Sequence, residues 1–185
     1  MQDKRTTQEG RKKVLIVIAP EKFRDEELGD PVAAFDKEGI DYDLVSTKTG
    51  LVRGVLGDEV MADLTFTDVS HQGIDTYDAI MIVGGGGSRL HLWNNQQLRA
   101  IVQSFETKEK IIGAICLSPV VLANAGILHG KKATVFIDET AISAIQKGGA
   151  VYTPEPVVVD GRIVTANGPQ ASKAFAEKLV RLLKK

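Results

Sequence analysis

The cysteine at position 116 lies where an apolar strand turns into a helix. Residues 111–115, Ile-Ile-Gly-Ala-Ile, are typical of a buried strand, and residues 117–124 of a helix. Ala114 and Ser118 place small residues two positions either side of Cys116, as a tight turn that carries a nucleophile requires. A thiol at a helix N-terminus feels the positive end of the helix dipole, which favours the thiolate. The pattern indicates a nucleophilic cysteine on a sharp turn; the alternative is a small buried apolar residue.

Four consecutive glycines, residues 84–87, follow an apolar strand predicted over residues 79–83. A backbone without side chains can approach a ligand closely and offer free N–H groups, which an oxyanion hole or a phosphate cradle needs. Neither G-x-G-x-x-G nor G-x-x-x-x-G-K-[ST] is present in the sequence, so a nucleotide site is not favoured. The remaining interpretations are an oxyanion-binding loop and a flexible turn.

Three acids, Asp25, Glu26 and Glu27, stand where the first helix is expected to begin. Acids in this position complement the helix dipole, which is the simpler interpretation of all three. A carboxylate beside a thiol could also exchange a proton with it and bind that proton more tightly if partly buried. One of the three acids is therefore a second candidate for chemistry.

The histidines, His71, His91 and His129, show no metal-ligand spacing, and no Cys/His cluster is present. We therefore expect no metal and no cofactor. His91 follows the glycine loop by a few residues and is the candidate imidazole for a Cys-His pair.

These residues are carried by apolar strands that alternate with helices. Strands are predicted over residues 14–19, 42–46, 79–83, 110–115 and 133–136, with a hairpin excursion over 50–67 and a hairpin over 157–165. Helices are predicted over residues 26–37, 92–106, 117–124, 139–147 and 171–183. Such alternation predicts an α/β fold with a mostly parallel sheet and helices on both faces. Ligands bind beyond the carboxyl ends of such strands, where residues 21–27, 84–89 and 116–119 form loops.

The composition is that of one globular domain. Of the 185 residues, 43% are hydrophobic and 25% charged, and we expect a disordered polar tail over residues 1–12 and a single domain over 13–185. The net charge of −1 favours neither nucleic acid nor an anionic membrane as a partner. No apolar run approaches the roughly 18 residues of a membrane span. One cysteine and no secretory signal predict a cytoplasmic protein.

The chain resembles the ThiJ/PfpI superfamily, whose fold is of the class I glutamine amidotransferase type, from about residue 13 to residue 183. The matching segments are Phe23-x-Asp25-x-Glu27-Leu28, Ala62-Asp63-Leu64-Thr65-Phe66, Gly84-Gly85, Ala114-Ile115-Cys116 and Val157-Val158-Val159-Asp160-Gly161. The resemblance implies a flavodoxin-like three-layer sandwich in which Cys116 is the nucleophile and Glu27 contacts it. It also places an oxyanion hole at the backbone N–H groups of Gly85 and Leu117.

The sequence departs from the family's proteases at two positions. Those proteases carry His directly after the cysteine and Glu in the glycine loop, where this chain has Leu117 and Arg89. Ser118-Pro119 also replaces the usual Gly-Pro, and Arg24 replaces an acid often found three residues before Glu27. The chain is more similar to members without that His, which are associated with glyoxalase, deglycase, redox-sensing or chaperone roles.

The resemblance implies a cysteine-dependent hydrolase or glutathione-independent glyoxalase that acts on small reactive carbonyls through Cys116. The alternatives are an intracellular cysteine protease or amidase with a peptide substrate, and a redox-sensing or chaperone-like stress protein oxidised at Cys116. A homo-oligomer, a dimer or larger, is also implied. Arg89 and His91 are candidates for contacts with substrate or with a second subunit.

Overall fold

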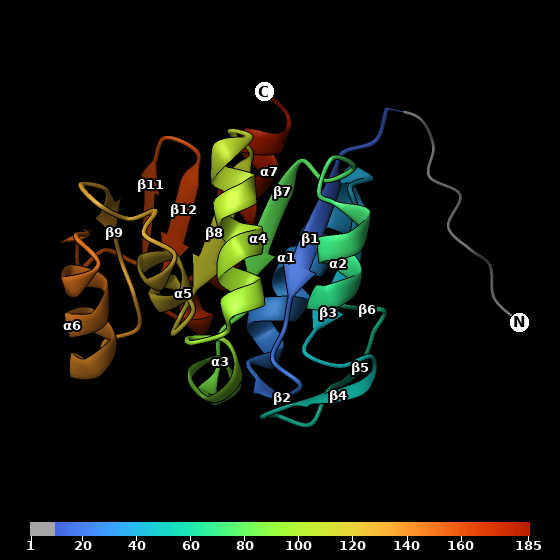
Figure 1. Ribbon diagram of the computed structural model, residues 1–185, viewed down its shortest axis with the longest axis horizontal. Coiled ribbons are helices and arrows are strands. Elements are labelled where there is room, and N and C mark those ends of the chain that lie inside the picture. The colour runs from blue at the N-terminus through green and yellow to red at the C-terminus, as the bar shows by residue number, and fades with distance from the viewer. Residues whose placement is uncertain (1–9) are drawn as a thin grey trace, which may run out of the picture.

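Residues 10–185 are described by the computed structural model, and they form an α/β sandwich around a seven-stranded sheet (Figure 1). The strand order is β11-β12-β8-β7-β1-β3-β6. The strands are β1 (Lys13–Val17), β3 (Asp41–Ser46), β6 (Leu64–Thr65), β7 (Ala79–Ile82), β8 (Ile111–Ile115), β11 (Val157–Asp160) and β12 (Ile163–Ala166). Neighbouring strands of this sheet pair in parallel, except that β11 pairs antiparallel with β12 across the predicted Asp160-Gly161 turn.

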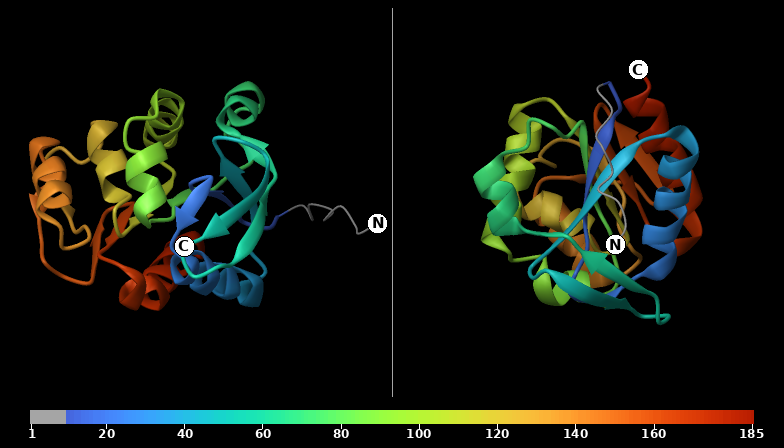
Figure 2. Two further views of the ribbon diagram at one scale, coloured as in Figure 1. Left: turned by 90° about the horizontal axis from the view of Figure 1, so that it is seen from below. Right: turned by 90° about the vertical axis from the view of Figure 1, so that its right-hand side faces the viewer.

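Helices cover both faces of the sheet, as Figure 2 shows in its left view. The helices are α1 (Asp25–Glu38), α2 (Phe66–Gln72), α3 (Gly86–His91), α4 (Gln96–Thr107), α5 (Pro119–Asn124), α6 (Glu139–Lys147) and α7 (Ser172–Leu183), with a 3-10 turn at Pro169–Ala171 before α7. One apolar core joins the sheet to α2, α4, α5 and α6, and the other joins it to α1 and α7. The central strands are buried on both faces, because each face packs against helices. The predicted three-layer architecture is confirmed.

A small sheet flanks the carboxyl end of β1. Its strands are β2 (Glu21–Phe23), β4 (Gly50–Gly54) and β5 (Glu59–Ala62), in the order β2-β4-β5. The hairpin predicted over residues 50–67 is therefore shorter, since it ends at Ala62 and the chain then returns to the main sheet as β6.

The helix α2 was not predicted from the sequence. Thr65 caps it by accepting a hydrogen bond from the backbone of Asp68, whose carboxylate accepts one from the backbone of Thr65 in return. This reciprocal capping satisfies two backbone donors at the helix start. The segment has few apolar residues, so periodicity alone did not reveal the helix.

The segment after the glycines also differs from the prediction. Gly86–His91 form the helix α3, and the helix predicted from residue 92 begins at Gln96, where the Asn95 side chain accepts a hydrogen bond from Leu98 N at 2.9 Å. Glycine is a poor helix former, which hid the short helix.

The strand predicted over residues 133–136 is wrong in extent. The strand β9 covers Lys132–Ala133 and pairs with β10 (Val151–Tyr152) in a sheet of its own. Beyond Ala133 the chain leaves the strand, and Phe136 N donates a hydrogen bond of 2.8 Å to Cys116 O. The segment is thereby held beside the cysteine.

Most of the tail predicted over residues 1–12 lies outside the described residues, which begin at Gly10. Lys12 O accepts a hydrogen bond of 2.9 Å from Asp41 N, so the end of this segment lies along β3. Among residues 10–185, no helix has the length and apolar character needed to cross a membrane.

Candidate active site

Cys116 occupies a strained turn between β8 and α5. Its φ of 63° lies in the left-handed region that residues with a side chain rarely adopt. Cys116 N donates to Ala166 O at 2.8 Å, and Cys116 O accepts from Phe136 N at 2.8 Å. The turn is therefore held from both sides, which confirms the sharp elbow predicted from the sequence.

The hydroxyl of Ser118 ties the elbow to the neighbouring strand. It donates a hydrogen bond of 2.7 Å to Val83 O and shares a second, of 2.8 Å, with the hydroxyl of Ser88. Both serines are buried. Because a buried polar pair of this kind is costly to break, the elbow and the glycine loop are fixed relative to each other. The sequence analysis treated Ser118 as a small residue and did not predict this bond.

The glycine loop approaches the elbow at Gly84. A Cβ built there would lie 2.5 Å from Glu27 Oε2 and 2.7 Å from Ile115 O, and closer still to the Cys116 side chain. Gly85 has a φ of 99°, and a Cβ on it would lie 2.5 Å from Lys22 O. Residues 84 and 85 therefore must be glycine for the cysteine, the acid and the loop to meet.

Glu27 is the acid that the fold places beside the thiol. Its side chain is fully buried, and Oε2 accepts a hydrogen bond of 2.9 Å from Gly84 N. Oε1 is also buried and accepts no hydrogen bond from any of residues 10–185. Burial raises the pKa of Glu27 to about 7, although the Cys116 thiol and the Gly84 N–H both stabilise the carboxylate. The carboxyl is thus poised to change protonation near neutral pH.

The other two acids of the predicted trio have structural partners. Both oxygens of Asp25 accept backbone hydrogen bonds from the β4–β5 turn, from Leu56 N at 2.8 Å and Asp58 N at 2.9 Å. Glu26 pairs with the Arg24 guanidinium through two hydrogen bonds of 2.8 and 2.9 Å. Arg24 is thereby engaged at the surface next to the site.

Burial and the nearby Glu27 carboxylate raise the pKa of the Cys116 thiol to about 12. The backbone N–H groups of Gly85 and Leu117 act on the sulfur in the opposite direction and do not outweigh burial. The expected stabilisation of the thiolate by a helix dipole is wrong for the resting protein, because α5 begins at Pro119 and the sulfur lies in the interior. The Glu27 carboxylate therefore opposes ionisation of Cys116 in the resting protein.

The two basic candidates have partners outside the elbow. His91 Nε2 lies 3.1 Å from Glu21 Oε1, and no hydrogen bond joins it to Cys116 in the described chain. Arg89 donates to Asp138 Oδ1 at 2.6 Å, and its guanidinium lies 4.8 Å from the centre of the Trp93 ring. A Cys-His pair with His91 is therefore not formed. Within residues 10–185, no group of three His, Cys, Asp or Glu is placed to hold a metal ion.

Trp93 links this basic cluster to the elbow. Its indole N–H donates a hydrogen bond of 2.8 Å to Leu117 O. Because Leu117 O is held, the peptide plane between Leu117 and Ser118, directly after the elbow, is fixed. This bond was not predicted from the sequence, since an indole near a glycine loop is ordinarily a packing residue.

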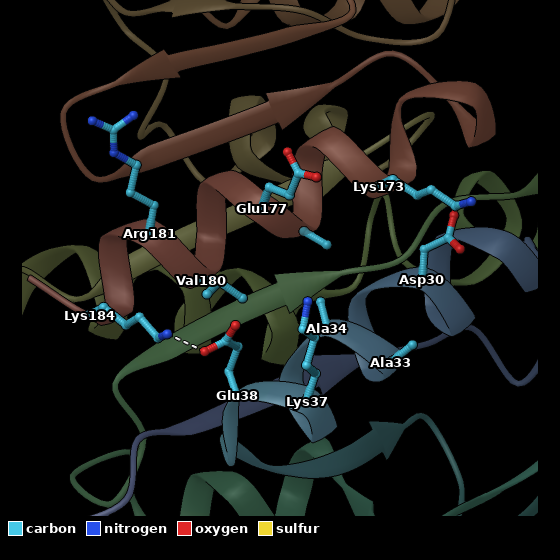
Figure 3. Close-up of a pocket in the computed structure, with 11 residues that line it drawn as sticks. Asp30, Ala33, Ala34, Lys37, Glu38, Lys173, Glu177, Val180, Arg181 and Lys184 are labelled. Carbon is cyan, nitrogen blue, oxygen red and sulfur yellow. Dashed lines mark hydrogen bonds and ion pairs between the residues drawn. The ribbon is translucent and has the colours of Figure 1, made fainter.

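Among the cavities of the described chain, one lies near the elbow and another lies on the far side of the sheet from α4, and neither is lined by Cys116 or Glu27. A cavity of about 320 Å³ adjoins the elbow and is lined by Phe136, Ile137, Asn167, Gly168, Pro169 and Gln170. A larger one, of about 590 Å³, lies between α1 and α7 and is bordered by Ala34, Val180 and the Lys184–Glu38 ion pair (Figure 3). None of the predicted site residues lines either cavity. Neither cavity was predicted from the sequence, because each is formed by segments that are distant along the chain.

The elbow, the buried acid and the glycine loop on a parallel sheet define a cysteine-elbow α/β protein. The sequence matches the DJ-1/PfpI family over residues 12–182, and the chain belongs to this family. A protein of Methanocaldococcus jannaschii is 48% identical over 94% of this chain and 83% of its own length, and the deglycase PfpI of Pyrococcus furiosus is 33% identical over 93% and 99%. The crystal structure of a ThiJ/PfpI domain protein from Brachyspira murdochii superposes with a TM-score of 0.88 at 34% identity, over 95% of this chain and 98% of that one.

Proposed function

We propose that this protein is a cysteine-dependent enzyme that converts small reactive carbonyls, with Cys116 as nucleophile and Glu27 as proton carrier. The observation that carries the proposal is the meeting of the buried Glu27 carboxyl and Cys116 at Gly84, where a Cβ would lie 2.5 Å from Glu27 Oε2 and closer still to the Cys116 side chain. Relatives support the class of substrate, since one from Pyrococcus furiosus is named a deglycase and one from Caenorhabditis elegans a glutathione-independent glyoxalase.

The first step is addition of the thiol to an aldehyde. Glu27, ionised, takes the thiol proton as the sulfur bonds to the carbonyl carbon, and the C=O electron pair moves to the oxygen. The N–H groups of Gly85 and Leu117 face the sulfur and would hold this developing alkoxide, a contribution of roughly 3 kcal/mol per donor in comparable sites. Return of the proton from Glu27 gives a hemithioacetal.

A 2-oxoaldehyde can then rearrange through the same carboxyl. Glu27 removes the hydrogen from the sulfur-bearing carbon, and a proton is returned to the neighbouring carbon, so that a thioester of a 2-hydroxy acid forms without net oxidation. Water hydrolyses this thioester to the 2-hydroxy acid and restores the thiol. A pKa of about 7 suits Glu27 to both directions of proton transfer at neutral pH.

Peptide hydrolysis is disfavoured by the residue that follows the nucleophile. An amide must receive a proton on its leaving nitrogen, and Leu117 has none to give. Loss of general acid help costs about 10²- to 10⁴-fold in rate. Addition to an aldehyde expels no leaving group, so the carbonyl reaction does not have this requirement.

The test compares consumption of glyoxal and methylglyoxal with hydrolysis of casein by the wild type, Cys116→Ala and Leu117→His. We expect measurable dicarbonyl consumption, weak or absent proteolysis, and a loss of at least about 10³-fold in dicarbonyl consumption for Cys116→Ala. Far-ultraviolet circular dichroism controls for folding. Dicarbonyl consumption that survives Cys116→Ala contradicts the proposal, and strong wild-type proteolysis would favour the peptidase alternative.

Oxidation sensing is the second candidate, and the site's hydrogen-bonding groups favour it. The two N–H groups that act on the sulfur, together with a protonated Glu27, could hold the oxygens of a sulfinic acid. Mass spectrometry after peroxide treatment should then show a gain of two oxygen atoms at Cys116. The same peroxide treatment of Glu27→Gln is the comparison. A smaller gain of two oxygen atoms in this variant would show that the Glu27 carboxyl stabilises the sulfinic acid, whereas an equal gain would show reactivity of the thiol alone.

We also propose, from the resemblance, that copies of the chain associate, with residues 84–93 near the contact. Leu90 in this segment is a large apolar side chain that is 63% exposed, and a second copy of the chain could cover it. Closed two-fold pairs are the commonest arrangement. Light scattering at micromolar concentrations should report a dimer or larger; a monomer across this range contradicts the proposal.

A further inference from the structure

Two buried serine hydroxyls join the elbow to the end of β7. The side chains of Ser88, in α3, and Ser118, two residues after the cysteine, are fully buried, and their oxygens lie 2.8 Å apart. Ser118 donates its hydroxyl proton to Val83 O at 2.7 Å, because a carbonyl can only accept. A hydroxyl has one proton to donate, so Ser88 is the donor in the bond between the two serines. The hydrogen bonds therefore run in one direction, from Ser88 to Ser118 to Val83 O.

The carbonyl that accepts from Ser118 belongs to the peptide group that also binds Glu27. Val83 O and Gly84 N are the two ends of one planar peptide, so a hydrogen bond to the oxygen fixes the direction of the N–H. Gly84 N donates at 2.9 Å to Glu27 Oε2. Because β7 ends at Ile82, this peptide lies just past the last paired residue of the strand. The Ser118 hydroxyl thus holds, from one side, the peptide that binds Glu27 on the other.

The next peptide along the chain has the same arrangement toward the thiol. Gly84 O accepts a hydrogen bond of 3.0 Å from Arg24 N, and the N–H of the same peptide, that of Gly85, acts on the Cys116 sulfur. Two successive peptides thus direct one N–H group to the acid and one to the sulfur. A backbone donor fixes the second peptide, whereas the side chain of Ser118 fixes the first. A single substitution can therefore release the peptide that binds the acid.

A hydrogen bond to the carbonyl of a peptide also polarises its N–H group and strengthens the bond that this N–H donates. The Gly84 N–H stabilises the Glu27 carboxylate and lowers its pKa, in opposition to burial. The other groups that act on Glu27 are the Cys116 thiol and the Arg24 charge, which also lower its pKa, and the Glu26 charge, which raises it. Within residues 10–185, the hydrogen bonds of the serine hydroxyls lead to the Gly84 peptide and to none of these three other groups.

We propose that Ser118, supported by Ser88, is a positioning residue that holds the Gly84 N–H on the Glu27 carboxylate and so sets the pH at which this carboxyl takes up a proton. Both serines act through the peptide between Val83 and Gly84. The inference rests on the proposed function for its catalytic consequence, because Glu27 is the proton carrier there. Without the Ser118 hydroxyl the peptide is free to turn, its bond to Glu27 weakens and the anion becomes less stable. The midpoint of the Glu27 titration then rises.

The first experiment follows the titration of Glu27 by nuclear magnetic resonance of its carboxyl carbon, in protein that contains isotope-labelled glutamate. The resonance of Glu27 is the one missing from Glu27→Gln. We expect the midpoint to rise by at least about 0.5 pH unit in Ser118→Ala. It should rise less in Ser88→Ala, where the Ser118 hydroxyl still bonds to Val83 O. If Ser118→Ala does not fold, Ser88→Ala decides the question, since no rise in its midpoint would overturn the inference.

Ser172→Ala is the matched control. The Ser172 side chain is also buried, and its hydroxyl is hydrogen-bonded to Pro169 O at 2.7 Å and to the Asp30 carboxylate. Loss of this hydroxyl should lower the free energy of unfolding, as loss of the Ser118 hydroxyl does, but leave the Glu27 midpoint unchanged. An unchanged midpoint in folded Ser118→Ala, or an equal rise in Ser172→Ala, would overturn the inference.

The second experiment measures how dicarbonyl consumption depends on pH, and it separates this inference from the proposed function. If ionised Glu27 accepts the thiol proton, the acid limb of kcat/KM for methylglyoxal should move to higher pH in Ser118→Ala by the same amount as the Glu27 midpoint. Ser172→Ala should keep the wild-type profile. A raised midpoint in a protein that consumes no dicarbonyl would support the positioning role of Ser118 and reject the proposed function. Dicarbonyl consumption with an unchanged midpoint would support the function and reject the positioning role.

Discussion

The first turn of α1 supports two regions of the molecule that use a buried carboxylate in opposite ways. On the hairpin side, both oxygens of Asp25 accept backbone hydrogen bonds from the β4–β5 turn. On the elbow side, Glu27 has one oxygen bonded to Gly84 N and one without a hydrogen bond, beside the Cys116 thiol. Asp25 fastens a turn, whereas Glu27 has an oxygen free for a proton.

The difference shows that burial alone does not make an acid functional. A buried carboxylate whose oxygens are hydrogen-bonded contributes to stability, because its desolvation is compensated. A buried carboxyl whose hydrogen bonds do not compensate its desolvation is destabilised as an anion and binds a proton more tightly, as the raised pKa of Glu27 shows. On the elbow side, the buried Glu27 anion lowers the stability of the fold, and the same destabilisation makes this carboxyl bind a proton more tightly.

The largest expected effect comes from Gly84, which separates Glu27 from Cys116. Gly84→Ala would place a methyl group 2.5 Å from Glu27 Oε2, so we expect a loss of roughly 3 kcal/mol or more in unfolding free energy together with loss of activity. Gly86→Ala is the matched control, because nothing lies within 4 Å of a Cβ at that position. Urea unfolding of both variants tests this. A stable and active Gly84→Ala protein would show that the two groups need not meet so closely.

The pH dependence of stability should reveal the unsatisfied acid. The folded pKa of Glu27, about 7, exceeds its ordinary value of 4.5, so its contribution is fully present below about pH 4.5 and is lost as the pH rises through 7. The whole loss corresponds to about 3 kcal/mol. We therefore expect Glu27→Gln to gain unfolding free energy relative to the wild type between these pH values. If the curves of unfolding free energy against pH were parallel for the wild type and Glu27→Gln, they would contradict the raised pKa of Glu27.

Removal of the Asp25 charge, on the hairpin side, should lower the free energy of unfolding, whereas removal of the Glu27 charge should raise it. Asp25→Asn replaces an acceptor of two backbone hydrogen bonds by an amide that can donate, so one part-buried N–H group of the turn loses its partner. We expect a loss of about 2 kcal/mol in unfolding free energy, with dicarbonyl turnover within about 3-fold of the wild type. Denaturant unfolding and steady-state rates measure the two quantities. A large loss of turnover in the folded variant would mean that the hairpin takes part in the reaction.

Sequence patterns located the elements of the site better than the contacts between them. The turn at Cys116 and the close approach at Gly85 were predicted because small residues and glycines at a strand end have few other uses. Which of three consecutive acids meets the thiol could not be derived from local pattern. Asp25 and Glu27, two positions apart, point to nearly opposite sides of a helix, and the sheet decides which side holds the cysteine. The resemblance to a family supplied Glu27 instead.

Other features depended on tertiary structure. The predicted activation of Cys116 by a helix dipole was inferred from the turn alone. Burial raises the pKa of the thiol more than the dipole lowers it, and burial depends on how the helices cover the two faces of the sheet. The cavity at Phe136 joins segments thirty residues apart, each of which has ordinary loop composition. The helix α3 was hidden by the glycines that also form the site.

We propose that the ionisation of Cys116 is coupled to that of Glu27, and the pH profile of Cys116 alkylation by iodoacetamide measures this coupling. The Glu27 charge raises the pKa of the thiol, so Glu27→Gln should move the midpoint of the alkylation profile to lower pH by at least about one unit. Glu26→Gln, which removes a charge that is paired with Arg24, should leave the midpoint unchanged. An unchanged midpoint in Glu27→Gln, or an equal shift in both variants, would contradict the claim.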